Sequence, residues 1–270
     1  YCKNLEFIEI PSSVKSIGYY VFEYCENLKE VIFEESSQIN TIGSFVFSSC
    51  KSLKNIFFGG TIDDWFRIKF NGSSSNPMCD AQHIYMLNEN NTWYEPTEIV
   101  IPDTVTSIGD YQFCGFDNLT KVTISNSVTS IGKDAFYNSN IQKIVNNSDL
   151  IFEFGSSDYG YIAENAIVII DKDGVENCKD GTIIKDDFIF IKENEQYKLI
   201  SYIGTEDTVT LPLDINGEEY TIYEMKGVKN VIIPEGFTEI NDYAFRYCES
   251  LQSINIPNTV EYIGRYAFYG

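Results

Sequence analysis

The sequence predicts a repeat solenoid that is rich in β-strand, with one short parallel strand in each turn of about 23 residues. An Ile-Gly pair recurs along the 270 residues and is followed by an aromatic position and a Cys-x-x-Leu unit. A fixed period of roughly 20 to 50 residues is typical of solenoids and related arrays. The copies form three pairs, with spacings of 25, 23 and 23 residues. They are Ile17-Gly18 and Ile42-Gly43, Ile108-Gly109 and Ile131-Gly132, and Ile240-Asn241 and Ile263-Gly264.

The end of each repeat is the segment predicted to form the strand. In the first complete copy, Leu28 is followed by Val31 and Phe33, and such alternation of apolar residues has the period of a half-buried strand. Proline cannot donate into a strand ladder, so it marks the end of the strand. It occupies that position at Pro11, Pro102, Pro234 and Pro257. Parallel stacking of these strands would place successive turns about 4.7–4.9 Å apart.

The segment before each strand predicts a tight turn. Glycine is replaced once, by Asn241, and Asn is the residue that best tolerates a left-handed backbone after Gly. We therefore expect a positive φ at this position. The stretch around pairs such as Ala135-Phe136 is too short for a full helix, so one helical or 3₁₀ turn is expected. The phenylalanines predicted to stack as a core column are Phe22, Phe47, Phe113, Phe136, Phe245 and Phe268.

The whole pattern, I-P-x-x-V-x-x-I-G-x-x-A-F-x-x-C-x-x-L-x-x-V-x-I, resembles the leucine-rich repeats of the BspA-like class, also called the Treponema pallidum type. The resemblance implies a right-handed leucine-rich-repeat solenoid from a family of bacterial or protist surface proteins. It implies adhesion to host matrix proteins or to other cells. Replacement of the proline by Glu34 or Ser125, and of the cysteine by Phe116, would not break a turn. Asn146, in place of an apolar residue, predicts an interruption of the solenoid.

Two irregular stretches divide the repeats. Leucine-rich repeats are expected in residues 1–58, 99–146 and 226–270, and the last copy stops half-way, so both ends look cut from a longer array. Residues 59–98 predict a variant repeat, with a helix of about eight to ten residues that Thr61 and Asp64 cap and that Asn71-Gly72 ends. Residues 147–225 predict a β-rich connector with a hairpin on FIFIKENEQYKLISYI, followed by a lengthened repeat.

The charge balance argues against two classes of partner. The chain has 19 Lys and Arg against 40 Asp and Glu, for a net charge of -21. Nucleic acids and anionic membranes both require clusters of basic side chains, so we expect neither as a partner. No apolar stretch approaches the roughly 18–20 residues that span a bilayer, and the first residues lack the layout of a signal peptide. We therefore expect no membrane insertion within this chain and any targeting signal outside it.

No motif for catalysis, metal or cofactor is present in the sequence. The single histidine, His83, has no nucleophile motif beside it, and paired carboxylates are so frequent in an acidic chain that a solvated face is their default interpretation. Four of the seven cysteines occupy the repeat slot, namely Cys2, Cys25, Cys50 and Cys248. We expect buried thiols, with disulfides or a metal site as the alternative. The sequence thus predicts no enzyme and no cofactor.

Weak candidates for macromolecule binding lie between the Ile-Gly pair and the Phe column. Tyrosine occupies four of the six copies of one variable position: Tyr20, Tyr111, Tyr243 and Tyr266. Tyrosine is enriched in binding surfaces, although the ring could simply cover the turn. Trp65 is a fifth candidate, for which core packing is the favoured interpretation.

A non-catalytic binding module is the function that these observations favour. Solenoids present long, regular surfaces that bind other macromolecules. The family resemblance implies a secreted or cell-surface bacterial protein whose partner is a protein or glycan on a host or neighbouring cell. The alternative is a passive stalk that holds another domain, and a remote alternative is a carbohydrate-active enzyme that uses carboxylates of the 147–225 connector.

Overall fold

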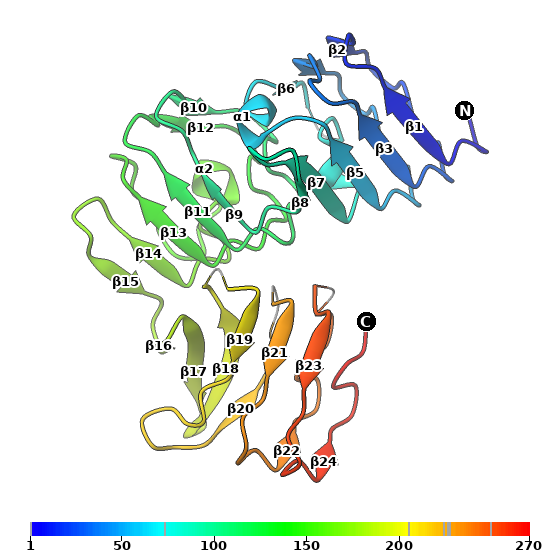
Figure 1. Ribbon diagram of the computed structural model, residues 1–270. Helices are drawn as coiled ribbons and strands as arrows, with labels where there is room; N and C mark the ends of the chain where they lie inside the picture. Colours follow the sequence, from blue (N-terminus) through cyan, green and yellow to red (C-terminus); the bar gives the residue numbers. More distant parts are fainter. Residues whose placement is uncertain (1, 73, 205, 224, 226–227, 249) are drawn as a thin grey trace. The chain divides into compact units, whose positions relative to one another are not determined.

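The computed structural model describes residues 2–72, 74–204, 206–223, 225, 228–248 and 250–270, which form two units (Figure 1). Unit 1 comprises residues 1–177 and unit 2 comprises residues 178–270. Each unit is built from short strands that pair in parallel with a strand one turn further along the chain. This pairing confirms the predicted repeat solenoid.

The longer strands of unit 1 form two mostly parallel sheets. The first contains, in spatial order, β1 (Phe7–Ile10), β3 (Glu30–Phe33), β5 (Asn55–Phe58), β7 (His83–Leu87) and the antiparallel β8 (Trp93–Tyr94). The second contains β15 (Glu176–Cys178), β14 (Val168–Ile170), β13 (Lys143–Asn146), β11 (Lys121–Ile124) and β9 (Glu98–Val100). Ile8 pairs with Val31 and Val31 with Ile56, so equivalent apolar residues of successive turns share one core.

A second set of strands, each only two residues long, holds the segment that ends in the Ile-Gly pair. It comprises β2 (Ser16–Ile17), β4 (Thr41–Ile42) and β6 (Lys69–Phe70) in one sheet and β10 (Ser107–Ile108) and β12 (Ser130–Ile131) in another. Ile42 and Val31 belong to the same buried cluster. A turn therefore contributes a longer and a shorter strand to the core, where the sequence predicted one.

Unit 2 contains the predicted hairpin. β17 (Phe188–Glu193) and β18 (Gln196–Tyr202) pair antiparallel, and β16 (Thr182–Lys185) and β20 (Tyr220–Ile222) flank them. The other strands are β19 (Thr208–Thr210), β21 (Asn230–Ile232) and β23 (Ser253–Asn255) in one parallel sheet and β22 (Glu239–Ile240) and β24 (Tyr262–Ile263) in another. Because β18 pairs in parallel with β20, the hairpin covers a strand edge that would otherwise be unpaired.

The turn that carries the phenylalanine column differs in detail from a helical turn. Alternate N–H groups donate to the next turn of the solenoid, as from Phe22 to the carbonyl of Val46 at 3.0 Å. The intervening groups donate within the turn, as from Cys25 to the carbonyl of Phe22 at 3.1 Å. Backbone hydrogen bonds therefore connect this segment to the next turn of the solenoid and also stabilise its own turn.

The predicted phenylalanine column is present. The stacked pairs, with their ring-centroid distances, are Phe22 and Phe47 at 5.6 Å, Phe113 and Phe136 at 5.3 Å, and Phe245 and Phe268 at 5.4 Å. Offset stacking of this kind is a favourable arrangement of aromatic rings. The column thus contributes packing between turns as well as burial.

The expectation of a positive φ at the Gly slot is wrong. None of these glycines, nor Asn241, has a left-handed backbone. A Cβ atom on Gly43 would lie 2.7 Å from the carbonyl carbon of Gly18, and one on Gly264 would lie 2.6 Å from that of Asn241. Glycine is present because adjacent turns approach each other closely. Asn241 instead faces β20, where its Oδ1 accepts the N–H of Ile222 at 3.1 Å.

Adding a methyl group at two copies of this slot is expected to have different effects. Gly43→Ala should destabilise unit 1 by about 1–3 kcal/mol, because the new Cβ overlaps the Gly18 backbone. Gly18→Ala should be neutral or stabilise by up to about 1 kcal/mol, since the nearest atom to its Cβ, in Val21, is 3.9 Å away. Urea unfolding followed by circular dichroism measures both variants, and equal effects would contradict the close-approach role of Gly43.

The helix predicted in residues 59–98 is shorter than expected. α1 (Ile62–Trp65) has the predicted capping box, in which the Thr61 hydroxyl accepts the Asp64 N–H and the Asp64 carboxylate accepts the Thr61 N–H. The helix does not reach eight residues because Lys69 and Phe70 pair with β4 as β6. A short 3₁₀ helix, η1 (Pro77–Cys79), follows. The stretch therefore remains part of the solenoid.

Asn146 does not interrupt the solenoid. β13, which ends at Asn146, pairs in parallel with β14, so the sheet gains a further strand. The Asn146 side chain is buried, where Nδ2 donates to the carbonyl of Leu150 at 2.7 Å and Oδ1 accepts from the backbone and hydroxyl of Ser148. The loop after β13 leads to α2 (Asp158–Tyr161) before the chain returns to β14. Asn146 fits because the loop satisfies its polar atoms.

Candidate functional site

The variable position between the Ile-Gly pair and the phenylalanine column has a left-handed backbone in every clear copy. Its φ values are 61° at Tyr20, 60° at Phe45, 57° at Tyr111, 51° at Asp134, 64° at Tyr243 and 54° at Tyr266. A second left-handed position follows four residues later, as at Tyr24 and Tyr247. A bulky residue is unfavourable in this conformation, and Gly, Asn or Asp would be tolerated more easily. Tyrosine at these positions therefore needs a compensating interaction.

In unit 1 the compensating interaction is an exposed aromatic stack. The rings of Tyr20 and Phe45 lie 5.3 Å apart and are inclined by only 9°. Tyr20 is 54% exposed and its neighbours Tyr19 and Tyr24 are exposed as well. We call Tyr19, Tyr20, Tyr24 and Phe45 the unit 1 aromatic ladder. Within it, the Tyr20 and Phe45 rings cover each other on one face, and all four side chains are exposed to solvent.

Two of the five predicted binding candidates do not belong to an exposed surface. The Trp65 side chain is fully buried; its Nε1 donates to the carbonyl of Gln112 at 2.8 Å, and Gln112 Nε2 donates back to the Trp65 carbonyl at 2.7 Å. Trp65 is therefore a core residue, because residues 59–98 pack against the turn that contains Gln112. Tyr111 is half-buried in the same core cluster, and its carbonyl accepts Nδ2 of Asn76 at 2.7 Å.

In unit 2 the two remaining candidates lie together with arginines. Tyr243 and Tyr266 stack with ring centroids 5.7 Å apart. The Arg246 guanidinium lies over the rings of Tyr243 and Tyr247, at 5.2 and 4.5 Å, and that of Arg265 lies over Tyr266 at 5.1 Å. We call Tyr243, Arg246, Tyr247, Arg265, Tyr266 and Tyr269 the unit 2 Tyr-Arg surface. The arrangement combines the residue types that dominate protein-binding hot spots.

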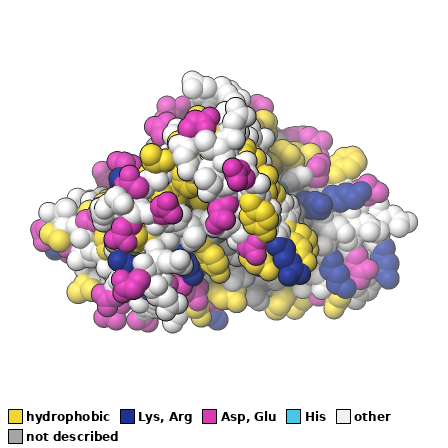
Figure 2. Space-filling view, turned by 90° about the horizontal axis from the view of Figure 1, so that it is seen from below, with side chains coloured by type: hydrophobic (Ala, Val, Ile, Leu, Met, Phe, Trp, Pro, Cys, Tyr) yellow, Lys and Arg dark blue, Asp and Glu magenta, His cyan; other side chains and the backbone are white. Residues whose placement is uncertain are grey.

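The chain that carries these aromatic residues is strongly acidic, with a net charge of -21. Figure 2 shows acidic side chains spread over one face of the molecule, with exposed hydrophobic side chains between them. The exposed tyrosines include Tyr20, Tyr247, Tyr262, Tyr266 and Tyr269. Exposed apolar surface rimmed by polar residues is typical of interaction sites.

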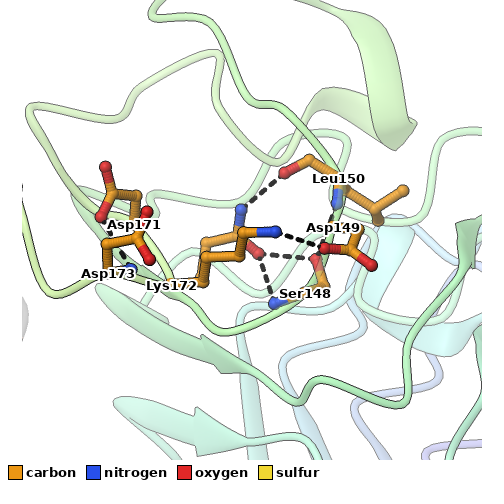
Figure 3. A network of polar contacts seen from close by, with 7 residues as sticks. Ser148, Asp149, Leu150, Asp171, Lys172 and Asp173 are labelled. Carbon is orange, nitrogen blue, oxygen red and sulfur yellow. Dashed lines mark hydrogen bonds and ion pairs between the residues drawn. The ribbon is translucent and has the colours of Figure 1, made fainter.

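An open groove of about 610 Å³ lies beside β13 and β14 in unit 1. Leu150, Phe152 and Ile169 contribute its apolar lining. Lys172 reaches across to Asp149, with Nζ 2.6 Å from Oδ1, while Asp171 and Asp173 lie together on the other side of Lys172 (Figure 3). The hydrogen bond from Lys172 lowers the pKa of the Asp149 carboxyl, so this carboxylate is not a candidate general acid.

A family model for the BspA type leucine-rich repeat region matches six copies in the chain, in residues 1–90, 89–173 and 211–270. The chain belongs to the BspA-type leucine-rich repeat family. The match runs through the whole of the irregular stretch 59–98, in agreement with its place in the solenoid. No curated protein matches the chain.

Three solved structures are similar to this BspA-type chain. A leucine-rich cell surface protein from Faecalibacterium prausnitzii is 21% identical, with 98% of this chain and 85% of that chain covered and a TM-score of 0.35. A leucine-rich repeat protein from Bacteroides ovatus is 20% identical, with 99% and 64% covered and a TM-score of 0.33. The pneumococcal vaccine antigen PcpA is 21% identical, with 98% and 54% covered and a TM-score of 0.29. The chain thus spans less than two thirds of the last two proteins.

The described residues of this BspA-type chain hold no group of three or more His, Cys, Asp or Glu side chains that could bind a metal ion. His83 Nδ1 lies 3.1 Å from Glu95 Oε1, which also accepts Nδ2 of Asn118 at 2.9 Å. This cluster joins β7 to the start of the following repeats. Burial raises the pKa of the Cys50 thiol to about 12, which keeps it protonated and unreactive. No helix in the described ranges is long and apolar enough to cross a membrane.

The disulfide between Cys79 and Cys114 is a feature that the sequence interpretation missed. Neither cysteine occupies the Cys-x-x-Leu slot, but Cys178 also lies outside it, so this signal reduced the candidates to three without identifying the pair. In the slot, Cys25 and Cys50 are buried as expected, whereas Cys2 is exposed. Gly115 allows the approach of the two segments, because a Cβ there would overlap the Met78 carbonyl oxygen. The bond therefore ties η1 to the turn of the phenylalanine column.

Proposed function

We propose that this chain is a non-catalytic binding module of a cell-surface protein and that its exposed tyrosines engage macromolecules on another cell. The observation that carries the proposal is the use of tyrosine at left-handed positions such as Tyr20, Tyr243 and Tyr266, where Gly or Asn would be less strained. Strained residues of this kind cluster at functional sites. Membership of a family of leucine-rich repeat proteins supports the same role, since solenoids present extended binding surfaces.

The arrangement of the rings favours a protein over a glycan as the partner. A sugar ring packs on the open face of an aromatic ring. In the unit 1 aromatic ladder, Tyr20 and Phe45 cover each other, and in the unit 2 Tyr-Arg surface an arginine covers Tyr266. The exposed edges and hydroxyl groups suit the mixed polar and apolar contacts of a protein interface.

The disulfide between Cys79 and Cys114 supports a location outside the cytoplasm. Disulfides persist in oxidising compartments and at cell surfaces, and they are rare where thiols are kept reduced. This argument is independent of family membership. A surface location places the exposed tyrosines where they can meet a partner on another cell.

Removal of the tyrosine rings tests the proposal. The wild-type chain is probed on arrays of immobilised extracellular matrix proteins and of glycans, together with Tyr20→Asn/Tyr24→Asn and Tyr243→Asn/Tyr266→Asn. We expect wild-type binding to at least one matrix protein and a loss of at least about tenfold in one double variant, which corresponds to removal of a hot spot. The thermal midpoint should change little, since the loss of the ring contacts is offset by the better fit of Asn to the left-handed backbone.

A matched control is Tyr223→Asn, because Tyr223 is 46% exposed in unit 2 but is not at a left-handed position. It should bind as the wild type does. A chain that binds nothing on either array would contradict the proposal and favour a passive stalk. Binding to glycans alone would contradict the preference for a protein partner.

A further inference from the structure

The arginines of this chain are concentrated on one surface. The sequence contains only three, Arg67, Arg246 and Arg265, and the last two belong to the unit 2 Tyr-Arg surface. Arg67 forms an ion pair with Asp64, with Nη1 2.7 Å from Oδ1. With 40 acidic residues in the chain, carboxylate partners are abundant. An arginine that is held away from them is therefore distinctive.

Arg265 is such an arginine. Its guanidinium lies over the Tyr266 ring at 5.1 Å, and it makes no ion pair with any of the residues that the structure describes. The nearby Asp242 carboxylate accepts the backbone N–H of Arg265 at 2.6 Å. A planar guanidinium that is stacked on a ring keeps the N–H groups of its edge for a bidentate acceptor, and a carboxylate matches that geometry. The attraction between the guanidinium and the ring also favours this position before a ligand arrives.

Further exposed aromatic rings continue from the Tyr266 ring that this guanidinium covers. The ring centroids of Tyr266 and Tyr269 are 5.4 Å apart, and those of Tyr247 and Tyr269 are 5.8 Å apart. All three are more than 40% exposed. Arg246 Nη2 donates to the Tyr247 hydroxyl at 2.9 Å and so orients that ring. Apolar side chains of a partner that covered these rings would exclude water from a charge-assisted hydrogen bond to Arg265, which strengthens it.

We infer that the unit 2 Tyr-Arg surface docks a protein segment in which an Asp or Glu carboxylate pairs with Arg265 while neighbouring apolar residues cover Tyr247, Tyr266 and Tyr269. The inference rests on the proposed function and names the chemistry of its partner. A sulfated glycan offers a similar anion, but its repeated charges are repelled by a chain of net charge -21. A single carboxylate in an apolar segment meets much less repulsion.

Selection from a random peptide library tests the inference. Peptides displayed on phage are selected on the intact wild-type chain, on Arg265→Gln and on Arg67→Gln, and the folded state of each is checked by its thermal midpoint. We expect enrichment of peptides with Asp or Glu next to apolar residues on the wild type and on Arg67→Gln. Their affinity for Arg265→Gln should be at least about tenfold lower, the loss expected for a charge-assisted hydrogen bond. The affinity of the peptides for Arg265→Lys should lie between those for the wild type and for Arg265→Gln. Lysine keeps the positive charge but lacks the two parallel N–H donors of the guanidinium.

Three outcomes would overturn the inference. They are equal enrichment on the wild type and Arg265→Gln, selected peptides without carboxylates, and Arg265-dependent binding to heparin in place of peptides. A failure here is distinguishable from a failure of the proposed function. Suppose that Arg265→Gln binds the matrix-protein array as the wild type does, while Tyr243→Asn/Tyr266→Asn does not. That result would support the proposed binding module and contradict the inference of a carboxylate partner.

Discussion

Replacement of Phe47 by Ala is expected to destabilise unit 1 by about 3–5 kcal/mol, the loss typical of a large aromatic side chain removed from a packed core. Phe47 is completely buried and stacks on Phe22 with ring centroids 5.6 Å apart. In a solenoid each turn packs only on its neighbours, so the cavity also weakens the contacts of the two adjacent turns. The shift of the urea unfolding midpoint of unit 1 measures the effect.

The matched control is Phe45→Ala, two residues earlier in the same turn. Phe45 is 37% exposed and contacts Tyr20 in the unit 1 aromatic ladder. Its removal should destabilise by only about 0.5–1.5 kcal/mol, which is the contribution of an aromatic pair. A similar loss in both variants would contradict the assignment of Phe47 to the core column and Phe45 to the surface.

Removal of the disulfide is expected to destabilise unit 1 by about 2–4 kcal/mol, because the bond closes a long loop in the unfolded chain. Cys79 and Cys114 are 35 residues apart in the sequence. The double variant Cys79→Ser/Cys114→Ser is compared with the wild type by urea unfolding with and without a reductant. The reductant should lower the wild-type midpoint toward that of the variant and leave the variant unchanged.

Cys2→Ser is the control, since Cys2 is exposed and makes no disulfide. It should unfold as the wild type does in both conditions. A wild-type midpoint that does not respond to reductant would contradict a stabilising role for the bond and would remove an independent argument for an extracytoplasmic location.

The candidate site was only partly predictable. The variable position after the Ile-Gly pair directed attention to Tyr20, Tyr243 and Tyr266, which belong to the two proposed binding surfaces, because a repeat reveals which positions are free to vary. It did not separate them from Tyr111, whose side chain packs against the unit 1 core and whose carbonyl accepts a hydrogen bond from Asn76 in residues 59–98. The arginines were not recognised either. The role proposed for Arg246 and Arg265 depends on the tyrosines over which their guanidinium groups lie.

The sequence by itself determined the solenoid, the period of its turns and the phenylalanine column. These features are local: each turn fills the same slots with the same residue types, so a pattern of about 23 residues is enough to specify them. The hairpin of β17 and β18 was predictable for the same reason, since its alternation and its turn are close together in the chain.

Only the tertiary structure decided how the turns meet. The left-handed φ angles occur at the tyrosines and not at the glycines of the Ile-Gly pairs. Gly43 is needed because its turn approaches the backbone of Gly18 closely. The tertiary structure also buried Trp65 against Gln112 and joined Cys79 to Cys114. The last three of these contacts join residues that are 25 or more positions apart in the chain and within a few ångströms in space. A repeat pattern records what each turn contains, whereas contact between turns depends on their stacking.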